Sequence, residues 1–141
     1  MAAPAPPTTR PPGRTVPEPR DTDALRGRPV LVTGATGFVG RHLVRRLNRE
    51  GAEVHALTRD TASRPDLSGT TWHQADLNDP FGLARLVRGI APAAVFHLAS
   101  HVAGQRDSAL ALPMLDANTR AAVAVMTAAH DLPGCRIVLA G

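Results

Sequence analysis

Residues 30–40 read Val-Leu-Val-Thr-Gly-Ala-Thr-Gly-Phe-Val-Gly. A short apolar run leads directly into three glycines, Gly34, Gly37 and Gly40, with two residues between each pair, and a helical pattern follows. Gly34 allows a tight turn, Gly37 leaves space for backbone to approach a phosphate, and Gly40 lets the helix lie close against the strand. The stretch predicts a strand-to-helix turn whose free N–H groups bind the pyrophosphate of a dinucleotide. The alternative is a glycine-rich turn that binds no ligand.

Strands and helices alternate from this turn to the end of the chain. Strands are predicted over 29–33, 53–57, 71–74, 93–98 and 136–140, and helices over 38–50, 79–89 and 113–130. Residues 60–70 are polar and are predicted to form a loop. The strands are almost continuously apolar, which is typical of parallel strands covered by helices on both faces. We therefore expect an α/β fold, a Rossmann-like doubly wound parallel sheet of about five strands.

The first two predicted helices have recognisable ends. In the first helix the arginines fall opposite the apolar residues, which predicts a buried face made of Phe38, Val39, Leu43, Val44 and Leu47. Gly51 is a typical C-terminal stop for this helix. Asp79 is a good N-cap for the second helix, with Pro80 in its first turn. These signals support the assignment of both helices.

The composition excludes several classes of protein. A chain of 141 residues forms one domain at most. No apolar run approaches the roughly 18–20 residues of a membrane span. The formal charge is +4, but every cation is an arginine and these are dispersed with few aromatic residues among them, so we expect no nucleic-acid surface. The single cysteine, Cys135, excludes an internal disulfide and is expected to be a small core residue.

Residues 1–28 differ from the rest of the chain. Prolines crowd the first twenty positions, and large apolar residues are almost absent. Such a segment cannot bury enough apolar surface to offset its ordering entropy, so we expect a disordered tail rich in proline and arginine. It has no continuous apolar stretch of the kind that a secretory signal needs, and its prolines and acidic residues argue against an organellar transit peptide. We therefore expect a cytoplasmic protein.

Four segments of the chain match, in order, the motifs of one protein family. They are Thr33–Gly40, Ala75–Asp79, Ala94–Ser100 and Asn118–Ala122. Together they resemble the extended short-chain dehydrogenase/reductase family, which comprises NAD(P)-dependent epimerases, dehydratases and reductases. The resemblance covers residues 29–141 and implies that this part of the chain is an NAD(P)-binding Rossmann domain.

The resemblance also implies a set of cofactor-binding residues. In the family the glycine motif binds the pyrophosphate, and the segment after the third strand contacts the adenine. The end of the fourth strand lies beside the ribose and nicotinamide, and the long helix contributes an asparagine. These positions are Gly34, Thr36, Gly37, Phe38, Val39 and Gly40, then Asp76 and Leu77, then Leu98, Ala99 and Ser100, and finally Asn118. Alternatively, Asp76 only caps a turn and Asn118 lies on a solvated helix face.

The six histidines show no metal-ligand spacing, so no metal site is expected. His97 is expected to be a hydrogen-bonded core histidine. His101 is expected to lie near the nicotinamide side without a catalytic role.

The choice between NADP and NAD depends on the end of the second predicted strand, which reads Thr58-Arg59-Asp60. Enzymes that prefer NAD commonly place a carboxylate here to accept hydrogen bonds from the ribose 2′-hydroxyl. A guanidinium at Arg59 can instead make two charge-assisted bonds to a 2′-phosphate. The sequence therefore favours NADP, and Asp60 would favour NAD if the turn were one residue longer.

The sequence contains no tyrosine and no lysine, and the resemblance makes this informative. The family's chemistry uses a tyrosine that exchanges a proton with the substrate and a lysine four residues later. We therefore expect the cofactor-binding half of an epimerase, dehydratase or reductase, without the substrate-binding part and inactive alone. The resemblance implies a sugar nucleotide or related carbonyl compound as substrate, and it admits a homodimer. The alternative is a non-catalytic nucleotide-binding or regulatory module.

Overall fold

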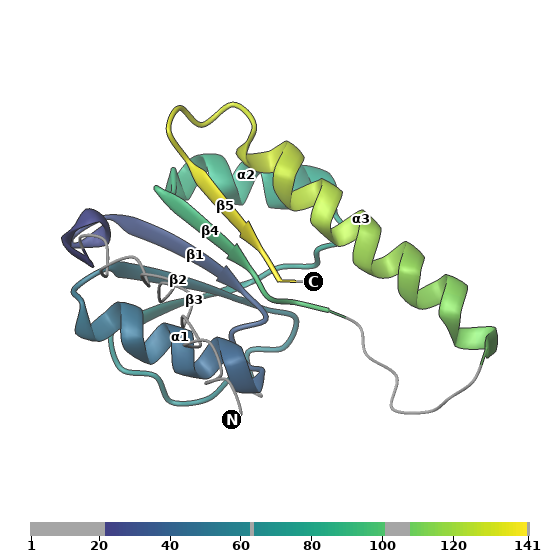
Figure 1. Ribbon diagram of the computed structural model, residues 1–141, viewed down its shortest axis with the longest axis horizontal. Coiled ribbons are helices and arrows are strands. Elements are labelled where there is room, and N and C mark those ends of the chain that lie inside the picture. The colour runs from purple at the N-terminus through teal and green to yellow at the C-terminus, as the bar shows by residue number, and fades with distance from the viewer. Residues whose placement is uncertain (1–21, 63, 101–107, 141) are drawn as a thin grey trace, which may run out of the picture.

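The computed structural model describes residues 22–62, 64–100 and 108–140 (Figure 1). Its elements in chain order are η1 Thr22–Leu25, β1 Pro29–Thr33, α1 Phe38–Arg49, β2 Glu53–Thr58, β3 Thr70–Gln74, α2 Pro80–Ile90, β4 Ala94–His97, η2 Ser108–Leu110, α3 Ala111–Ala129 and β5 Arg136–Leu139. Each predicted strand and helix is present, with bounds that differ by one or two residues from the sequence-based ones. Within these ranges no helix is both long and apolar enough to cross a membrane.

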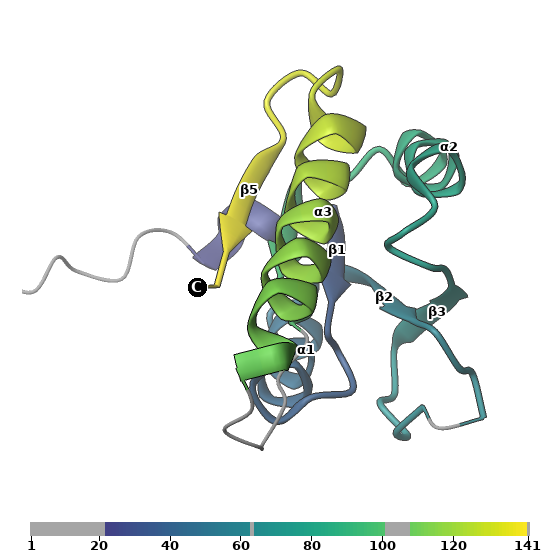
Figure 2. The ribbon, with the colours of Figure 1, turned by 90° about the vertical axis from the view of Figure 1, so that its right-hand side faces the viewer.

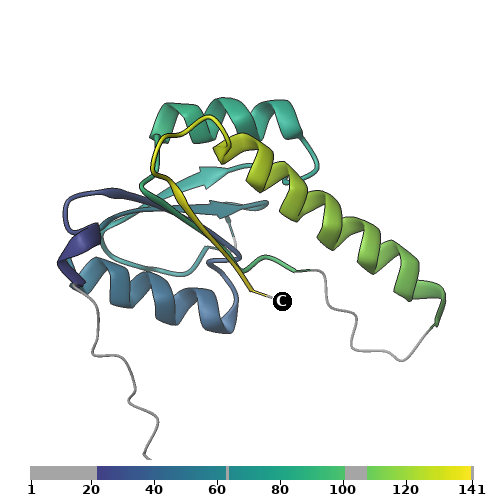
Figure 3. The ribbon, with the colours of Figure 1, turned by 45° about the horizontal axis from the view of Figure 1, so that its top comes forward.

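The five strands form one parallel sheet in the order β3-β2-β1-β4-β5. The helices cover both faces, with α1 on one side and α2 and α3 on the other (Figures 1 and 3). In register, Leu31 of the central strand lies between His55 of β2 and Val95 of β4. The strand order reverses between β1 and β4, so the connections that leave the carboxyl ends of these paired strands run to opposite faces of the sheet, and a ligand crevice is expected between them. The expected doubly wound α/β fold is confirmed.

The sheet separates two aliphatic clusters. One lies between the sheet and α1 and includes Val30, Val32, Val44, Leu47 and Val54. The other lies between the sheet and the pair α2 and α3, and includes Leu31, Leu57, Leu83, Val87 and Val125. Alternate residues of β1 therefore enter opposite clusters, as the two-residue period of a strand requires. Burial of both faces explains why the strands are almost continuously apolar in sequence.

The folded part of the chain begins earlier than predicted. The sequence placed Thr22–Arg28 in the disordered tail, but Leu25 packs against the α1-side cluster. The N–H of Gly27 donates to the carbonyl of Gly51 at 2.7 Å, and the N–H of Glu53 donates to the carbonyl of Arg28 at 3.0 Å. Leu25 and these two backbone hydrogen bonds, to Gly51 and Glu53, attach the segment Thr22–Arg28 to the folded part of the chain. Residues 1–21 of the predicted tail lie outside the described residues.

The buried face of α1 is shorter than predicted. Phe38 and Val39 are 73% and 63% exposed, while Gly40, Val44 and Leu47 are buried and Leu43 packs against the cluster. The first turn of α1 leaves the glycine turn at the end of the sheet, where no strand lies beneath it. The Phe38 ring instead meets the edge of His42, with ring centroids 4.9 Å apart. Helical spacing predicted which face of α1 is apolar, but it did not predict where along α1 contact with the sheet begins.

The strand β5 lies at one edge of the sheet, paired only with β4 in the described part of the chain. Val138 and Leu139 are nearly half exposed. Figure 2 shows α3 running alongside β5 and past it, and the two large apolar side chains Leu112 and Leu115 at its N-terminal end are exposed. The edge strand β5 and the start of α3 therefore leave apolar surface uncovered.

Candidate functional site

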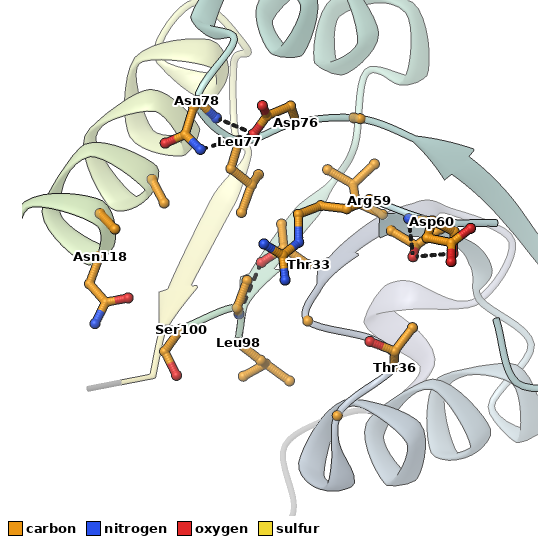
Figure 4. A pocket seen from close by; sticks show the side chains of 18 residues that line it. Thr33, Thr36, Arg59, Asp60, Asp76, Leu77, Asn78, Leu98, Ser100 and Asn118 are labelled. Carbon is orange, nitrogen blue, oxygen red and sulfur yellow. Dashed lines mark hydrogen bonds between the residues drawn. The ribbon is translucent and has the colours of Figure 1, made fainter. Parts of the chain in front are cut away.

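A pocket of about 620 Å³ lies at the carboxyl ends of the strands (Figure 4). The turns that follow β1, β2, β3 and β4 form its walls, and α3 closes one side with Ala117, Asn118 and Ala121. The lining residues thus come from segments far apart in sequence, from Thr33 to Ala121. This is the edge of an open α/β sheet at which ligands bind.

The glycine turn after β1 has two glycines that the fold itself requires. Gly34 adopts φ +69°, and a Cβ there would lie 2.6 Å from the backbone nitrogen of Ala99. A Cβ at Gly40 would collide with the carbonyl oxygen of Gly34. Gly34 therefore brings the turn against β4, and Gly40 brings α1 against the turn. These are the tight-turn and close-packing roles that the spacing predicts.

Gly37 differs from the other two glycines. It has an ordinary φ of −72° as the N-cap of α1, and a Cβ there would meet only the Gly34 carbonyl oxygen, at 3.2 Å. No side chain caps this helix end, and its first turn carries no acidic residue. The backbone N–H groups of a helix's first turn have no partner within the helix and attract anions. Gly37 therefore leaves a helix N-terminus open toward the pocket, as a pyrophosphate requires.

A buried hydrogen-bond cluster joins the ends of β1 and β4 beneath the turn. Thr33 Oγ1 lies 2.7 Å from His97 Nδ1, and the N–H of Ala99 donates to Thr33 Oγ1 at 3.3 Å. Thr33 and His97 are both buried. Burial lowers the pKa of His97, which keeps its ring neutral at pH 7. His97 is thus the hydrogen-bonded core histidine expected from the sequence, and it fixes the segment after β4 that lines the pocket.

The segment after β3 forms the opposite wall. Asp76 Oδ1 accepts the backbone N–H of Asn78 at 2.9 Å and its side-chain amide at 3.1 Å. Asp76 therefore caps a turn and also lines the pocket, so a capping role does not exclude contact with a ligand. Asp79 caps α2, since its Oδ1 accepts the N–H of Gly82 at 3.0 Å. These two aspartates give the wall a fixed backbone path.

The turn after β2 separates the two candidates for the ribose contact. Asp60 Oδ1 accepts the N–H of Ala62 at 2.8 Å, and the Asp60 backbone exchanges two hydrogen bonds with the Thr58 hydroxyl. Figure 4 shows the Arg59 guanidinium directed into the middle of the pocket, while Asp60 lies at its rim beside its own loop. Gln74 holds the Arg59 carbonyl through its amide at 3.2 Å. Arg59 is therefore better placed than Asp60 to meet a ligand.

Most of the residues named from the sequence come together in this pocket. Its lining includes Gly34, Thr36, Gly37, Arg59, Asp76, Leu77, Leu98, Ala99, Ser100 and Asn118. Phe38, Val39 and Gly40 do not line it: the first two side chains are exposed, and Gly40 packs beneath the turn. Asn118 reaches the pocket from α3, opposite the glycine turn (Figure 4). His101 lies outside the described residues.

The pocket also includes residues that sequence reasoning missed. They are Leu57, Ala75, Asn78, Ala117 and Ala121. Asn78 lies within the Ala75–Asp79 motif. An aspartate commonly accepts a hydrogen bond from the backbone two residues later, so Asp76 indicated that Asn78 belongs to a turn at this place. Ala117 and Ala121 flank Asn118 at positions i−1 and i+3, so one helix face signalled both. Within the described residues no cluster of three or more metal-ligating side chains occurs.

Comparison with known proteins identifies related sequences and structures. The chain is 56% identical over 45 residues to dTDP-4-dehydro-6-deoxy-D-allose reductase of a Streptomyces species, a match covering 32% of this chain and 13% of that protein. An epimerase from Methanothermobacter thermautotrophicus has a TM-score of 0.71 at 30% identity, over 84% of this chain and 36% of its own. A UDP-glucose-4-epimerase from Stenotrophomonas maltophila, solved with bound NAD and formylated UDP-arabinopyranose, has a TM-score of 0.66 at 26% identity, over 79% and 36%.

The chain therefore spans little more than a third of these two solved structures. A family model described as the NAD dependent epimerase/dehydratase family matches residues 30–141, which contain all of the sheet except its first residue, Pro29, and every segment that lines the pocket. The family's cofactor is a nicotinamide dinucleotide, and the glycine turn described above has the open helix end that such a cofactor needs. The chain belongs to the NAD dependent epimerase/dehydratase family, the extended short-chain dehydrogenases/reductases.

Proposed function

We propose that this chain binds NADP in preference to NAD, as the cofactor-binding half of an epimerase, dehydratase or reductase. The observation that carries the preference is the arrangement after β2. The Arg59 guanidinium points into the pocket, whereas the Asp60 carboxylate accepts a backbone hydrogen bond from its own loop. A guanidinium forms two parallel charge-assisted bonds with a phosphate, which a ribose hydroxyl cannot match.

Other walls of the pocket supply the remaining contacts of the proposed complex. The first turn of α1 and Gly37 would hold the pyrophosphate, and Asp76 and Leu77 would border the adenine. Ala99, Ser100 and Asn118 would border the nicotinamide end. The bound cofactor would supply hydride transfer. The chain's own part is to bind and orient it, with the Thr33–His97 cluster fixing the wall on which the nicotinamide would lie.

The proposed substrate is a sugar nucleotide or related carbonyl compound. Its support is the printed names of relatives, which include a dTDP-4-dehydro-6-deoxy-D-allose reductase and a GDP-mannose 4,6-dehydratase. The sequence contains neither tyrosine nor lysine, so the proton-exchanging pair of the family is absent from this chain. We therefore propose that these 141 residues turn over no substrate alone. A non-catalytic nucleotide-binding module is the second candidate, favoured by the same absence.

Calorimetric titration of the wild-type chain and two variants with NADPH and NADH tests the cofactor preference. Arg59→Ala should weaken NADPH binding about ten- to a hundredfold, since it removes a charge-assisted contact worth about 1.5–3 kcal/mol. NADH binding should change little. Asp60→Ala is the matched control on the next residue and should leave the NADPH-to-NADH ratio nearly unchanged. Equal losses for both cofactors in Arg59→Ala would reduce Arg59 to a surface charge, and a changed ratio in Asp60→Ala would return the choice to Asp60.

A further inference from the structure

His55 and His73 form a pair on neighbouring strands that no wall of the pocket uses. His55 Nδ1 lies 2.9 Å from His73 Nε2, with the ring planes 17° apart and their centroids 5.2 Å apart. The N–H and the lone pair of an imidazole lie in the plane of its ring. The contact is therefore a hydrogen bond in which one ring donates and the other accepts. Such a bond requires that at least one of the two rings is neutral.

The pair lies on the face of the sheet that α2 covers. Side chains alternate along a strand, so His55 shares a face with Leu57, and Leu57 is the Cα partner of His73. Leu57 packs with Leu83 and Val87 of α2. Both histidines are half-buried. If both rings were protonated, two N–H donors and two positive charges would face each other in a half-buried place, which is unfavourable.

Few charged groups face the pair. The charged side chains of β1, β2, β3 and α2, all fully described, are Glu53, Arg85 and Arg88, and each of them is exposed. Beyond these elements, Asp76 and Asp79 follow β3 at the pocket end. On α3, Asp116 and Arg120 form an ion pair with each other. The charged side chains of α1 lie on the opposite face of the sheet. Burial, and to a smaller degree the neighbouring His55, lower the pKa of His73. The surroundings therefore oppose a second proton.

His55 and His73 lie on the two strands, β2 and β3, that lead into two walls of the pocket. Arg59 is four residues after His55, and Asp76 is three residues after His73. In the described sheet β3 is an edge strand that bonds only to β2. Just beyond the histidines, the N–H of Ala75 donates to the Thr58 carbonyl at 3.0 Å, and Gln74 donates to the Arg59 carbonyl at 3.2 Å. The attachment of β3 to β2 thus sets the spacing between Arg59 and Asp76.

We propose that the His55–His73 hydrogen bond is a pH-sensitive latch that ties β3 to β2 and opens when both rings are protonated. Opening removes one of the bonds that hold the edge strand, while its backbone ladder to β2 remains, and so weakens the attachment of the wall formed by Arg59 and Asp76. One consequence, loss of stability in mild acid, is independent of any ligand. The other, weaker dinucleotide binding in mild acid, rests on the proposed cofactor function.

The sign of the pH effect follows from counting protons. The unfolded chain binds a proton on each histidine as the pH falls below about 6.5. In the folded protein burial and the neighbouring His55 lower the pKa of His73, so in this pH range the unfolded state binds more protons. Stability therefore falls as the pH falls from about 6.5 through the lowered pKa of His73 in the folded protein. One excluded proton changes the folding equilibrium constant by up to about tenfold per pH unit.

The variant His73→Gln separates the latch from other acid effects. The glutamine amide both donates and accepts, so it keeps a bond to His55 at every pH and removes the second titration. Urea unfolding from pH 7.5 to 5.0 measures the folding constant. The wild-type constant should fall more steeply than that of His73→Gln, by up to about tenfold per pH unit. Parallel profiles would overturn the latch. If His73→Gln does not fold, ¹⁵N NMR of the wild-type imidazoles decides: coupling across the N–H···N bond at pH 7.5 supports the latch, and its absence overturns it.

Binding of NAD⁺ over the same pH range tests the link to the pocket. NAD⁺ is the probe because the 2′-phosphate of NADPH itself titrates, as phosphate monoesters do with a pKa of about 6. Wild-type affinity should fall more between pH 7 and 5 than the affinity of His73→Gln. If neither protein binds any dinucleotide, the proposed function fails while the unfolding profiles still decide the latch. If the unfolding profiles differ but the NAD⁺ profiles are parallel, the coupling to the pocket is wrong.

Discussion

At the scale of single residues, the glycine turn divides its work between folding and binding. A Cβ at Gly34 or at Gly40 would collide with protein backbone, whereas Gly37 lines the pocket and a Cβ there would have only one close neighbour. The spacing of the three glycines predicts a different role for each of them. The structure shows that two of them hold β1, α1 and β4 together and that the third keeps a helix end accessible.

Exchanging single glycines for alanine tests this division. Gly40→Ala should destabilise the fold by about 3 kcal/mol, the upper end of the range for overpacking, because its Cβ meets fixed backbone. Gly37→Ala should cost less, about 1 kcal/mol, because alanine is a poorer N-cap than glycine but its Cβ would meet only one carbonyl oxygen, at 3.2 Å. Urea denaturation midpoints of the two variants give the comparison. Equal midpoints would show that the helix can shift away from the turn, against this account of Gly40.

The Thr33–His97 cluster predicts a further pH dependence. Burial lowers the pKa of His97 in the folded protein, so below about pH 6.5 the unfolded state binds the extra proton. Stability should therefore decrease as the pH falls from about 6.5 toward that lowered pKa. His97→Gln should flatten this part of the profile in urea unfolding, even if it is less stable at neutral pH. An unchanged slope would mean that His97 protonates freely in the folded protein.

At the scale of elements, the caps and strand ends decide where the pocket walls run. The N-cap Asp79 starts α2 directly after the wall formed by Asp76 and Asn78. Asp79→Ala should destabilise the protein by about 1 kcal/mol through the lost hydrogen bond to Gly82. Asp79→Ser, which restores a capping oxygen, is the matched control and should recover most of the loss in thermal or urea unfolding. No difference between the two variants would remove the cap from the account.

The elements were predictable from sequence where a local signal exists. The apolar runs of β1 and β4 and the capping residues of α2 marked those elements to within about two residues. Two expectations failed because they depend on packing at the ends of the sheet. Phe38 and Val39 fit the apolar period of α1 but have no strand beneath them, and Leu25 anchors a segment whose composition resembles a tail. Neither outcome can be read from local pattern, since each depends on where other elements stop.

The candidate site was predictable to the extent that motifs mark it. The glycine turn and the segments containing Asp76 and Ser100 were identified because each has a distinctive local sequence. Leu57 carries no such mark, and it lines the pocket because β2 ends beside it. Ala117 and Ala121 line it because α3 passes beside the pocket with the helix face that carries Asn118. Which of Arg59 and Asp60 faces the pocket required the structure, since a shift of one residue in the turn exchanges them.

At the scale of the whole molecule, one edge of the sheet leaves apolar surface uncovered. Val138 and Leu139 on β5 and Leu112 and Leu115 on α3 are exposed, and β5 presents an unpaired strand edge within the described residues. Such edges and patches promote association between molecules. We predict self-association at micromolar concentration and marginal stability. Val138→Lys should reduce the association in light scattering by placing a charge on the edge. A monomeric wild-type protein with a cooperative melt above about 60 °C would contradict this prediction.

The absence of tyrosine and lysine predicts the behaviour of the chain in an activity assay. NADPH oxidation followed at 340 nm, with keto-sugar nucleotides and simple ketones as substrates, should show no turnover above the rate without protein. A version extended by roughly 150 residues of the family's substrate-binding part, the size of a typical domain, should be active. Turnover by the 141-residue chain itself would require a proton donor other than the family's pair and would contradict the account of its chemistry.

The central claim is that the pocket at the carboxyl edge of the sheet binds a nicotinamide dinucleotide against the open end of α1. Calorimetric titration of the wild-type chain and Gly37→Val with NADPH tests it most directly. The valine side chain would occupy the space where the pyrophosphate approaches, while its Cβ meets only one carbonyl oxygen of the protein, at 3.2 Å. The account predicts saturable binding by wild type and a loss of at least about tenfold in a Gly37→Val protein that circular dichroism shows to be folded. Unchanged affinity in folded Gly37→Val would contradict it.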